Sequence, residues 1–387
     1  MADAGSIKRP ADHDTEEEPA GKTCRNGTSI YHASPAHSPP RPITFACRYV
    51  AGPMVGASDL AFRLLCRRHG TDTCYTEMLF SDRLVSDEAY RMRKLQTCTA
   101  DRPLVVQLQG NNPATVAAAS ALVERNCPCD AIDLNLGCPL PQAEAQCFGA
   151  YLLDKEHWPT LTAIITAMVN ATSLPVTVKI RLLPNADDTL ALCRLLAAAG
   201  CSLIAIHGRQ RPPPLQHRGQ RQSVAADLDA IRDVATAMGN GACILSNGNT
   251  EAPGDVGFNM KHTGAHGVMA AEGLLRNPLL FETPEHRVCA AAVESHDEPA
   301  EYATASLSKE ALAAVALEYL ALAESHPPED VSIVRGHLMW MLGKSGKGHR
   351  CTFEHLGPYS APQLRMALCD ANSVGELEMI VRAALSC

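Results

Sequence analysis

The 387-residue chain lacks the features that would assign it to a membrane or to the secretory route. No apolar run approaches the length of a membrane span, and the segment from Asp12 to Glu18 is acidic where a secretory leader is basic and then apolar. Basic residues are not in excess either, since 34 Lys and Arg stand against 42 Asp and Glu. We therefore expect no membrane association and a cytoplasmic or nuclear location. A monomer is a separate expectation, which these features do not decide.

Paired metal-ligand motifs are also missing, although the chain has 16 cysteines. The only close pair is Cys127-Pro128-Cys129, and neither a second pair nor a nearby histidine accompanies it. The cysteines are spread through helix-like and strand-like segments. Reduced thiols are therefore expected, and no metal site is predicted.

The net charge of −8 argues against a protein that is basic all over, as many nucleic-acid-binding domains are. Much of the acidity, however, lies in the first 18 residues and in the segment 294–301, whereas basic residues cluster at 63–69, 83–94 and 209–221. Any one of these clusters is more often a solvated helix face, but three of them in one part of the chain are consistent with a polyanionic partner.

Apolar runs of strand length alternate with segments of helical spacing after residue 41. The predicted strands are Thr44 to Val50, Thr73 to Glu77, Leu104 to Leu108, Ala131 to Leu136, Val176 to Ile180, Leu203 to His207, Cys243 to Ser246 and Gly267 to Met269. The predicted helices between them are Ser58 to His69, Asn112 to Arg125, Trp158 to Asn170, Asp188 to Ala199, Val224 to Met238 and Glu272 to Phe281.

Eight strand–helix units over about 240 residues are typical of a (β/α)8 TIM barrel, whereas a doubly wound sheet usually has fewer strands. We assign 42–285 to this barrel, which is followed by a small all-α helical domain at 309–387 with helical spacing throughout. The polar segment 286–308 is a predicted linker. Residues 1–41, rich in Pro, Ser, Asp and Glu, are a predicted disordered tail.

A thiol stands at the end of the fourth predicted strand, in the sequence Asp133-Leu134-Asn135-Leu136-Gly137-Cys138-Pro139. Glycine permits a sharp turn there, and proline prevents the strand from continuing. The strand is a rigid support, and a barrel gathers its strand ends on one face. Cys138 is therefore predicted to face a ligand, although a lone cysteine is more often a packed one.

Polar side chains also stand where the neighbouring strands should be apolar. Gln107 and Gln109 need partners, because burying an unpaired amide costs about 1–3 kcal/mol; a heteroaromatic ring or a backbone group would supply them. Lys179 either meets an anionic ligand or reaches out to solvent. The small, bent segment 51–56 after the first strand could lie flat against a planar ring or form an ordinary loop.

Three further strand ends carry residues suited to an anion. They read Ile206-His207-Gly208-Arg209, Ser246-Asn247-Gly248-Asn249 and Ala270-Ala271-Glu272-Gly273. The loops after the last two strands are the usual phosphate site of a barrel, where backbone N–H groups and a helix start receive the phosphate. Together these segments predict a phosphate-bearing cofactor such as FMN.

These motifs, in this order over residues 43–283, resemble the tRNA-dihydrouridine synthases, flavin enzymes that reduce uridine in tRNA. The segments Val268 to Gly273, Asn277 to Phe281 and Val334 to Leu338 are similar to the eukaryotic branch that acts at tRNA positions 16 and 17. Two segments depart from the family pattern. Leu140 to Phe148 is neutral to acidic where the family is basic, and Gln210 to Pro214 replaces the usual Thr-Arg.

The resemblance implies that FMN, reduced by NADPH or NADH, delivers hydride to uracil C6 while Cys138 protonates C5, with Asn135 and Arg209 beside the substrate. It implies tRNA as the partner, held in part by the helical domain. The flavin contacts that it implies are Pro53, Met54, Val55, Gln107, Lys179, His207, Asn247, Gly248, Asn249, Ala271 and Glu272. The alternatives are an FMN barrel that reduces a small molecule and a catalytically idle barrel that binds RNA.

Overall fold

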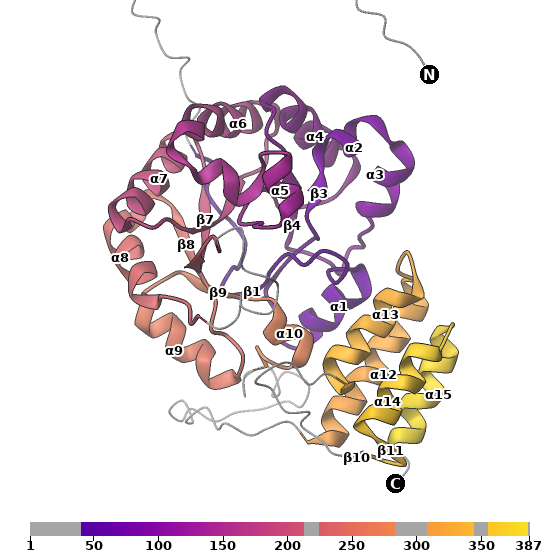
Figure 1. The fold of residues 1–387 in the computed structure, drawn as a ribbon. Coiled ribbons are helices and arrows are strands. Elements are labelled where there is room, and N and C mark those ends of the chain that lie inside the picture. The colour runs from indigo at the N-terminus through magenta and orange to yellow at the C-terminus, as the bar shows by residue number, and fades with distance from the viewer. Residues whose placement is uncertain (1–39, 213–223, 283–307, 344–354, 386–387) are drawn as a thin grey trace, which may run out of the picture. The chain divides into compact units, whose positions relative to one another are not determined.

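Eight parallel strands close into a barrel in the computed structural model, which describes residues 40–212, 224–282, 308–343 and 355–385. The strands are β1 (Tyr49–Ala51), β2 (Thr73–Tyr75), β4 (Leu104–Gln109), β5 (Ala131–Leu136), β6 (Val176–Leu182), β7 (Leu203–Gln210), β8 (Cys243–Asn247) and β9 (Gly267–Ala270). β2 pairs with both β1 and β4 and so closes the ring. The predicted TIM barrel is confirmed (Figure 1).

Helices surround the strands, as Figure 1 shows. In several of them a side chain just before the helix accepts a hydrogen bond from a backbone N–H of the first turn. These capping residues are Asp59, Asn112, Asn185 and Asp227. The helices are α1 (Leu60–Arg68), α2 (Ser81–Ser86), α3 (Glu88–Lys94), α4 (Pro113–Asn126), α5 (Pro141–Ala145), α6 (Trp158–Ala171), α7 (Ala186–Ala198), α8 (Leu228–Met238), α9 (Pro253–Thr263) and α10 (Glu272–Arg276).

Some elements differ from the sequence-based expectation. The first strand begins only at Tyr49, because the Asp72 carboxylate accepts the backbone N–H groups of Arg48 and Tyr49, which a longer strand would use in a ladder. The helix expected to reach Phe281 ends at Arg276, since Pro278 disfavours helical geometry at Asn277. A short strand β3 (Leu79–Phe80), followed by α2 and α3, was not predicted, nor was α9.

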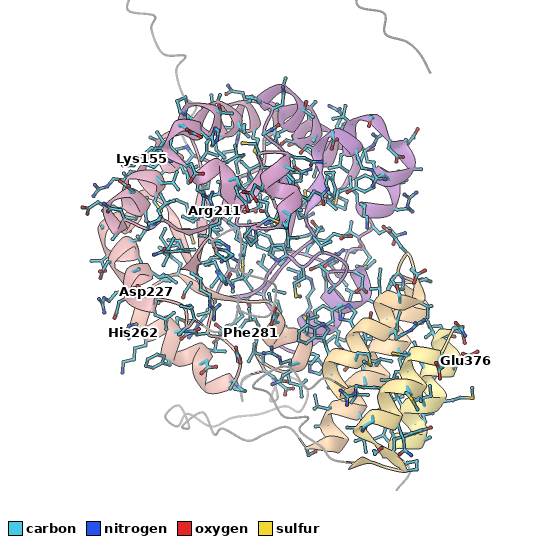
Figure 2. All side chains as sticks on the ribbon, viewed as in Figure 1. Lys155, Arg211, Asp227, His262, Phe281 and Glu376 are labelled. Carbon is cyan, nitrogen blue, oxygen red and sulfur yellow. The ribbon has the colours of Figure 1, made fainter. Side chains whose placement is uncertain are left out.

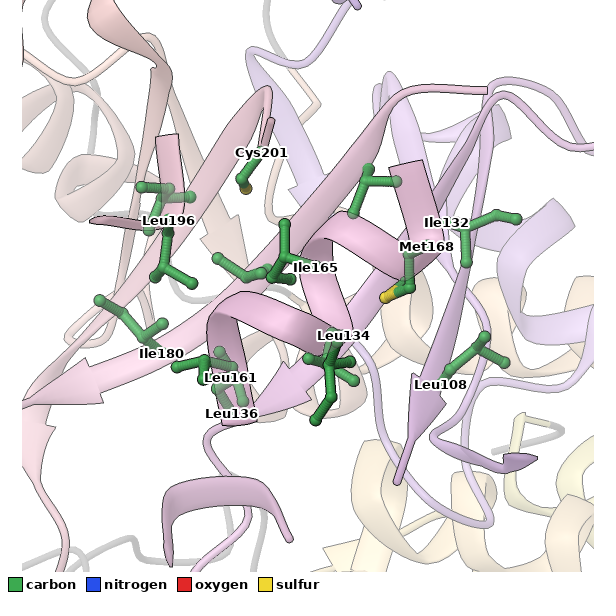
Figure 3. Packing of buried hydrophobic residues seen from close by; sticks show 14 of the residues in the cluster. Leu108, Ile132, Leu134, Leu136, Leu161, Ile165, Met168, Ile180, Leu196 and Cys201 are labelled. Carbon is green, nitrogen blue, oxygen red and sulfur yellow. The ribbon is translucent and has the colours of Figure 1, made fainter. Parts of the chain in front are cut away.

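Buried apolar side chains form one core inside the barrel and others outside it. Val50, Tyr75, Val105 and Met269 are among those that fill the interior. The alternate residues of β4, β5 and β6 face α4 and α6, and Figure 3 shows Ile132, Leu134 and Leu136 against Leu161, Ile165 and Met168. The strands are therefore buried on both faces, as in other parallel sheets.

The C-terminal segment packs on the outside of α1 through a core shared with the barrel. It consists of α12 (Lys309–Ser325), α13 (Val331–Leu338), a π-helical turn (Met339–Gly343), β10 (His355–Leu356), β11 (Tyr359–Ser360), α14 (Ala361–Asp370) and α15 (Val374–Leu385). The helical character of this segment is confirmed, but the expectation that it has no strand is wrong, because β10 and β11 form a short antiparallel hairpin.

Two predicted segments fall largely outside the described residues, the tail (1–41) and the linker (286–308). The boundaries assigned to the barrel and to the helical domain stay predictions. Among the described residues, no helix is long and apolar enough to cross a membrane.

Candidate functional site

The register of the strands brings five predicted residues to neighbouring places at the C-terminal end of the barrel. Asn135 pairs with Lys179 across β5 and β6, and His207 pairs with Asn247 across β7 and β8. Gln107 of β4 lies opposite Asp133, which is two residues before Asn135 on β5 and therefore deeper in the barrel. Because side chains alternate between the two faces of a strand, these residues share the inner face.

Cys138 is held directly above β5 by its neighbours in sequence and in space. The Asn135 side-chain oxygen accepts the backbone N–H groups of Gly137 at 3.1 Å and of Cys138 at 2.9 Å. Gly149, with a φ of +63°, approaches so closely that a Cβ there would lie 2.8 Å from the Cys138 carbonyl oxygen. The half-buried thiol is therefore fixed by a strand residue on one side and by a glycine on the other.

A buried carboxylate below Asn135 orients this arrangement. The Gln107 amide donates to Asp133 at 2.8 Å and accepts from the Asn135 amide at 2.8 Å, and Thr177 donates to the other Asp133 oxygen at 2.7 Å. Burial raises the pKa of Asp133 to about 7, against the hydrogen bonds from Thr177 and Gln107 that lower it. Asp133 is not among the site residues predicted from the sequence, although its place two residues before Asn135 on the same strand is a usable signal.

Lys179 carries an amine with no hydrogen-bond or ion-pair partner among the described residues. Burial, followed by the charge of Arg181, lowers its pKa to about 8, while Asp133 and Cys138 favour its charged form. The Arg181 guanidinium itself donates to the Gly137 carbonyl at 2.8 Å. Lys179 is thus a cation at neutral pH, available to a ligand in the barrel mouth.

His207 offers an unpaired donor to the same space. Arg209 Nη1 lies 3.3 Å from His207 Nε2, and since a guanidinium can only donate, the ring proton must be on Nδ1. This Nδ1 is buried and has no partner among the described residues. Burial lowers the pKa of His207 well below its usual value, helped by Lys179, Arg181 and Arg209. A neutral imidazole therefore points an N–H at whatever anion or carbonyl enters.

The loop after β8 uses its side chains internally and leaves its backbone to a ligand. Asn247 donates to the Met269 carbonyl at 2.8 Å, and Asn249 bonds Arg209 and both backbone groups of Ala226. Gly248 has a φ of +116°, and a Cβ there would lie 2.7 Å from the Ala226 side chain. Any contact from Gly248 or Asn249 to a cofactor would therefore come from the main chain.

The remaining predicted residues lie around the same mouth. Pro53 and Met54 are half-buried after β1, whereas the Val55 side chain is 67% exposed, so a ring covering this loop would shield it. Ala271 precedes α10 and Glu272 opens it. The Glu272 carboxylate is exposed and accepts from Arg276.

The basic clusters read from the sequence are largely paired within the protein. Arg63 and Arg67 both bond the buried Asp101, and Arg68 pairs with Glu318, so the arginines of the first cluster are engaged within the protein. Lys94 bridges Glu77 at 2.7 Å and Glu329 at 2.8 Å.

In the third cluster, Arg211, labelled in Figure 2, stacks on Tyr151 and pairs with Asp154 at 3.0 Å. Residues 213–223 of that cluster lie outside the described residues. Several cations of these clusters therefore already have acidic partners within the described part of the protein.

The model of the dihydrouridine synthase family matches residues 49–356. The chain belongs to this family. It is 40% identical over 270 residues to a tRNA-dihydrouridine(16/17) synthase-like protein of Mus musculus, across 68% of this chain and 54% of that one. It is 35% identical over 237 residues to the tRNA-dihydrouridine(16/17) synthase of Schizosaccharomyces pombe, across 61% and 57%.

It is also 36% identical over 249 residues to the tRNA-dihydrouridine(20a/20b) synthase of Saccharomyces cerevisiae, across 62% of both chains. The names of all three relatives specify NAD(P)(+). The match thus spans little more than half the length of the relatives. The family predicted from the strand-end motifs is confirmed.

Proposed function

We propose that this chain reduces uridine to 5,6-dihydrouridine in tRNA, with FMN as its cofactor and NADPH or NADH as reductant. When bound, FMN would supply the hydride that adds to uracil C6. The site geometry supports such a cofactor, because the His207 Nδ1–H is buried without a partner and the Lys179 amine has none among the described residues. Both are donors suited to the oxygens and ring nitrogens of a phosphorylated heterocycle.

Cys138 is the acid in this proposal. Hydride addition at C6 leaves negative charge on C5 and the adjoining carbonyl, which requires a proton at C5. In this proposal the Cys138 thiol donates that proton and becomes a thiolate. The Asn135 side chain, which fixes the Cys138 backbone, would at the same time lie beside the target base.

The phosphate of the cofactor would be received by His207 and by the backbone of Gly248, Asn249, Ala271 and Glu272, with Asn247 supporting that loop. The planar ring would rest on Pro53, Met54 and Val55 and meet Lys179, while the fully buried Gln107 would act on the site through Asn135. Arg209, which orients both His207 and Asn249, would act near the substrate through these contacts.

The observation that carries the proposal is the fixed thiol above a chain of inward-facing polar residues, in a chain of this family. A tRNA partner, a tRNA-binding role for 309–387, a cytoplasmic or nuclear location and a monomeric state belong to the same proposal. The base must leave its stack to reach the barrel mouth.

The test is to incubate the protein with FMN, NADPH and unmodified tRNA and to measure dihydrouridine by nucleoside mass spectrometry. Cys138→Ala should keep the flavin spectrum and its reduction by NADPH while uridine reduction falls about 10²- to 10⁴-fold. Cys147→Ala, in the same loop, is the matched control and should retain activity.

Retained activity in Cys138→Ala would remove the thiol from the mechanism. Flavin reduction without any dihydrouridine would instead favour a small-molecule substrate, and a protein without flavin would favour an idle RNA-binding barrel.

A further inference from the structure

A polar hollow of about 250 Å³ lies at the C-terminal end of β4, beside the start of α2. Gln109, the last residue of β4, and Ser81, the first of α2, form its inner wall. The residues Asn111 and Asn112 of the β4–α4 loop and Gln146, which follows α5, form much of the rest. None of the residues described above as flavin or substrate contacts lines this hollow.

Two of these polar side chains are largely buried and have no hydrogen-bond partner among the described residues, and the Ser81 hydroxyl is fully shielded from solvent. Gln109 is 5% exposed, and its amide makes no hydrogen bond with any described residue. Ser81 is 1% exposed, and its hydroxyl likewise has no partner in the described parts of the chain. Buried polar groups in folded proteins are nearly always satisfied, so two unpartnered groups on one hollow indicate that something else completes them.

The chemistry of the wall excludes an anion as the occupant. No residue that lines the hollow is basic, and Asp82 contributes a carboxylate. Lys94, on the following helix α3, is already engaged by Glu77 and Glu329. A phosphate or carboxylate would therefore meet acceptors and negative charge instead of cations.

The wall instead matches the edge of a nucleobase. A primary amide presents a donor and an acceptor side by side, which is the pattern that Gln and Asn use to read base edges. Proteins recognise single-stranded RNA through bases that are splayed out and hydrogen-bonded on these edges. The volume lies below the range of pockets for drug-sized ligands, so it suits one planar heterocycle.

The hollow is joined to the loop that carries the proposed catalytic thiol. Asn111 donates to the Gln146 carbonyl at 2.8 Å, and Phe148, which also lines the hollow, packs in the same small cluster as Cys138. We infer that this hollow binds a second, unpaired base of the RNA whose uridine is reduced at Cys138. The inference rests on the proposed function, because it takes RNA as the substrate.

The test measures RNA binding without turnover, by fluorescence anisotropy of the full-length FMN-loaded protein with a D-arm stem-loop and no reductant. A set of stem-loops, each with one abasic loop nucleotide, is titrated against the wild type, Gln109→Met and Gln142→Met. Gln142, an exposed glutamine of α5 that does not line the hollow, is the matched control.

We expect Gln109→Met to raise Kd about tenfold, the size of one lost base contact, and Gln142→Met to leave it unchanged. For the wild type, one of the abasic RNAs should have a Kd that is higher than that of the intact stem-loop by about the same factor. For Gln109→Met, the Kd of that abasic RNA should equal the Kd of the intact stem-loop, because the variant has already lost the same contact. Ser81→Ala should give a smaller loss at the same nucleotide. It also keeps the inference testable if Gln109→Met is poorly folded by thermal melting.

Coupling here means that the abasic change and Gln109→Met together raise Kd by no more than either does alone. If no abasic position shows such coupling, the inference is overturned and the hollow holds only water. A raised KM for NADPH in Gln109→Met with an unchanged Kd for RNA would also overturn it, because the base held there would then be the adenine of the reductant. If coupling is found but no dihydrouridine forms, the proposed function fails while the base site stands.

Discussion

Replacing His337 should uncouple the C-terminal helices from the barrel. His337 Nε2 lies 2.7 Å from the Asp59 carboxylate, and both side chains are buried. The ring also stacks on Phe62, with centroids 4.2 Å apart, and meets the edge of Tyr319. Asp59 is at the same time the N-cap of α1, the helix that follows the proposed flavin-facing loop.

The expected magnitude follows from what each variant removes. His337→Phe keeps a ring to stack but leaves a buried carboxylate without its partner, a change that costs about 3–5 kcal/mol in a fully buried pair. Because the α1 N-cap still satisfies one Asp59 oxygen, we expect a loss of about 2–4 kcal/mol in the free energy of unfolding. His337→Ala should cost about 1 kcal/mol more through the lost ring contacts.

Urea unfolding can follow each part of the molecule separately. The chain has two tryptophans, Trp158 in α6 of the barrel and Trp340 in the π-helical turn of the C-terminal segment. Fluorescence of Trp158→Phe therefore reports the C-terminal segment, and circular dichroism reports the whole. In His337→Phe the fluorescence transition should move to lower urea by more than the circular dichroism transition.

Asp59→Asn supplies the control, since asparagine keeps the helix cap but removes the charge. In that background His337→Phe should cost at least about 1 kcal/mol less than in the wild type. Equal costs in both backgrounds, or a loss below about 0.5 kcal/mol, would refute the pairing as the link between the two parts.

The pH dependence of the same pair has a fixed sign. Burial raises the pKa of Asp59, but His337, the Phe62 amide and Arg63 lower it by more, so the net pKa lies below 3.8. The stabilisation is therefore present above that pH and is lost as the pH falls through the folded-state pKa.

Three further predictions concern the site and its support. Gly149→Ala should destabilise the protein by about 1–2 kcal/mol and lower the rate of uridine reduction, because the new Cβ would displace the Cys138 carbonyl. Gly254→Ala, which has open space around it, is the control and should change neither quantity. Urea titrations and activity assays measure the two effects. Asp133 has a folded pKa of about 7 against an ordinary 3.8, so its contribution to stability is present below 3.8 and lost as the pH rises to 7. The free energy of unfolding of Asp133→Asn, relative to that of the wild type, should accordingly be higher at pH 8 than at pH 5. The same difference between the two proteins at both pH values would contradict the raised pKa. Asp101→Asn should cost about 3–5 kcal/mol, because it leaves two buried arginines without their carboxylate, and a midpoint within error of the wild type in thermal melting would disprove that role.

The barrel could be predicted from the sequence because its signals are local. Strands buried on both faces appear as short apolar runs, and the run from Ala131 to Leu136 coincides with β5. Polar residues that stand within these apolar runs or at their ends, such as Gln107, Lys179 and His207, can be recognised from the sequence for the same reason. Of the elements that were not predicted, β3 and α2 are too short to have a period of their own, whereas α9, with 11 residues, is not.

Pairing between distant residues could not be predicted. Nothing in the composition of the segment 63–69 distinguishes an exposed basic face from arginines that close on Asp101, which is more than thirty positions away. The same holds for Asp133, whose partners Gln107 and Thr177 come from two other strands. Sequence periodicity indicates which face a residue takes, but its partner depends on the register between strands.

The proposed catalytic geometry therefore depends more on strand register than on any one loop. Gln107 lies opposite Asp133, and Asn135 lies opposite Lys179, so the hydrogen bonds that lead from the buried carboxylate to the Cys138 backbone exist only in this alignment. A slip of β5 by one residue against both β4 and β6 would turn Asp133 and Asn135 to the outer face. The apolar residues that alternate with them, packed against α4 and α6, fix that alignment, and the core of the barrel thereby positions the thiol.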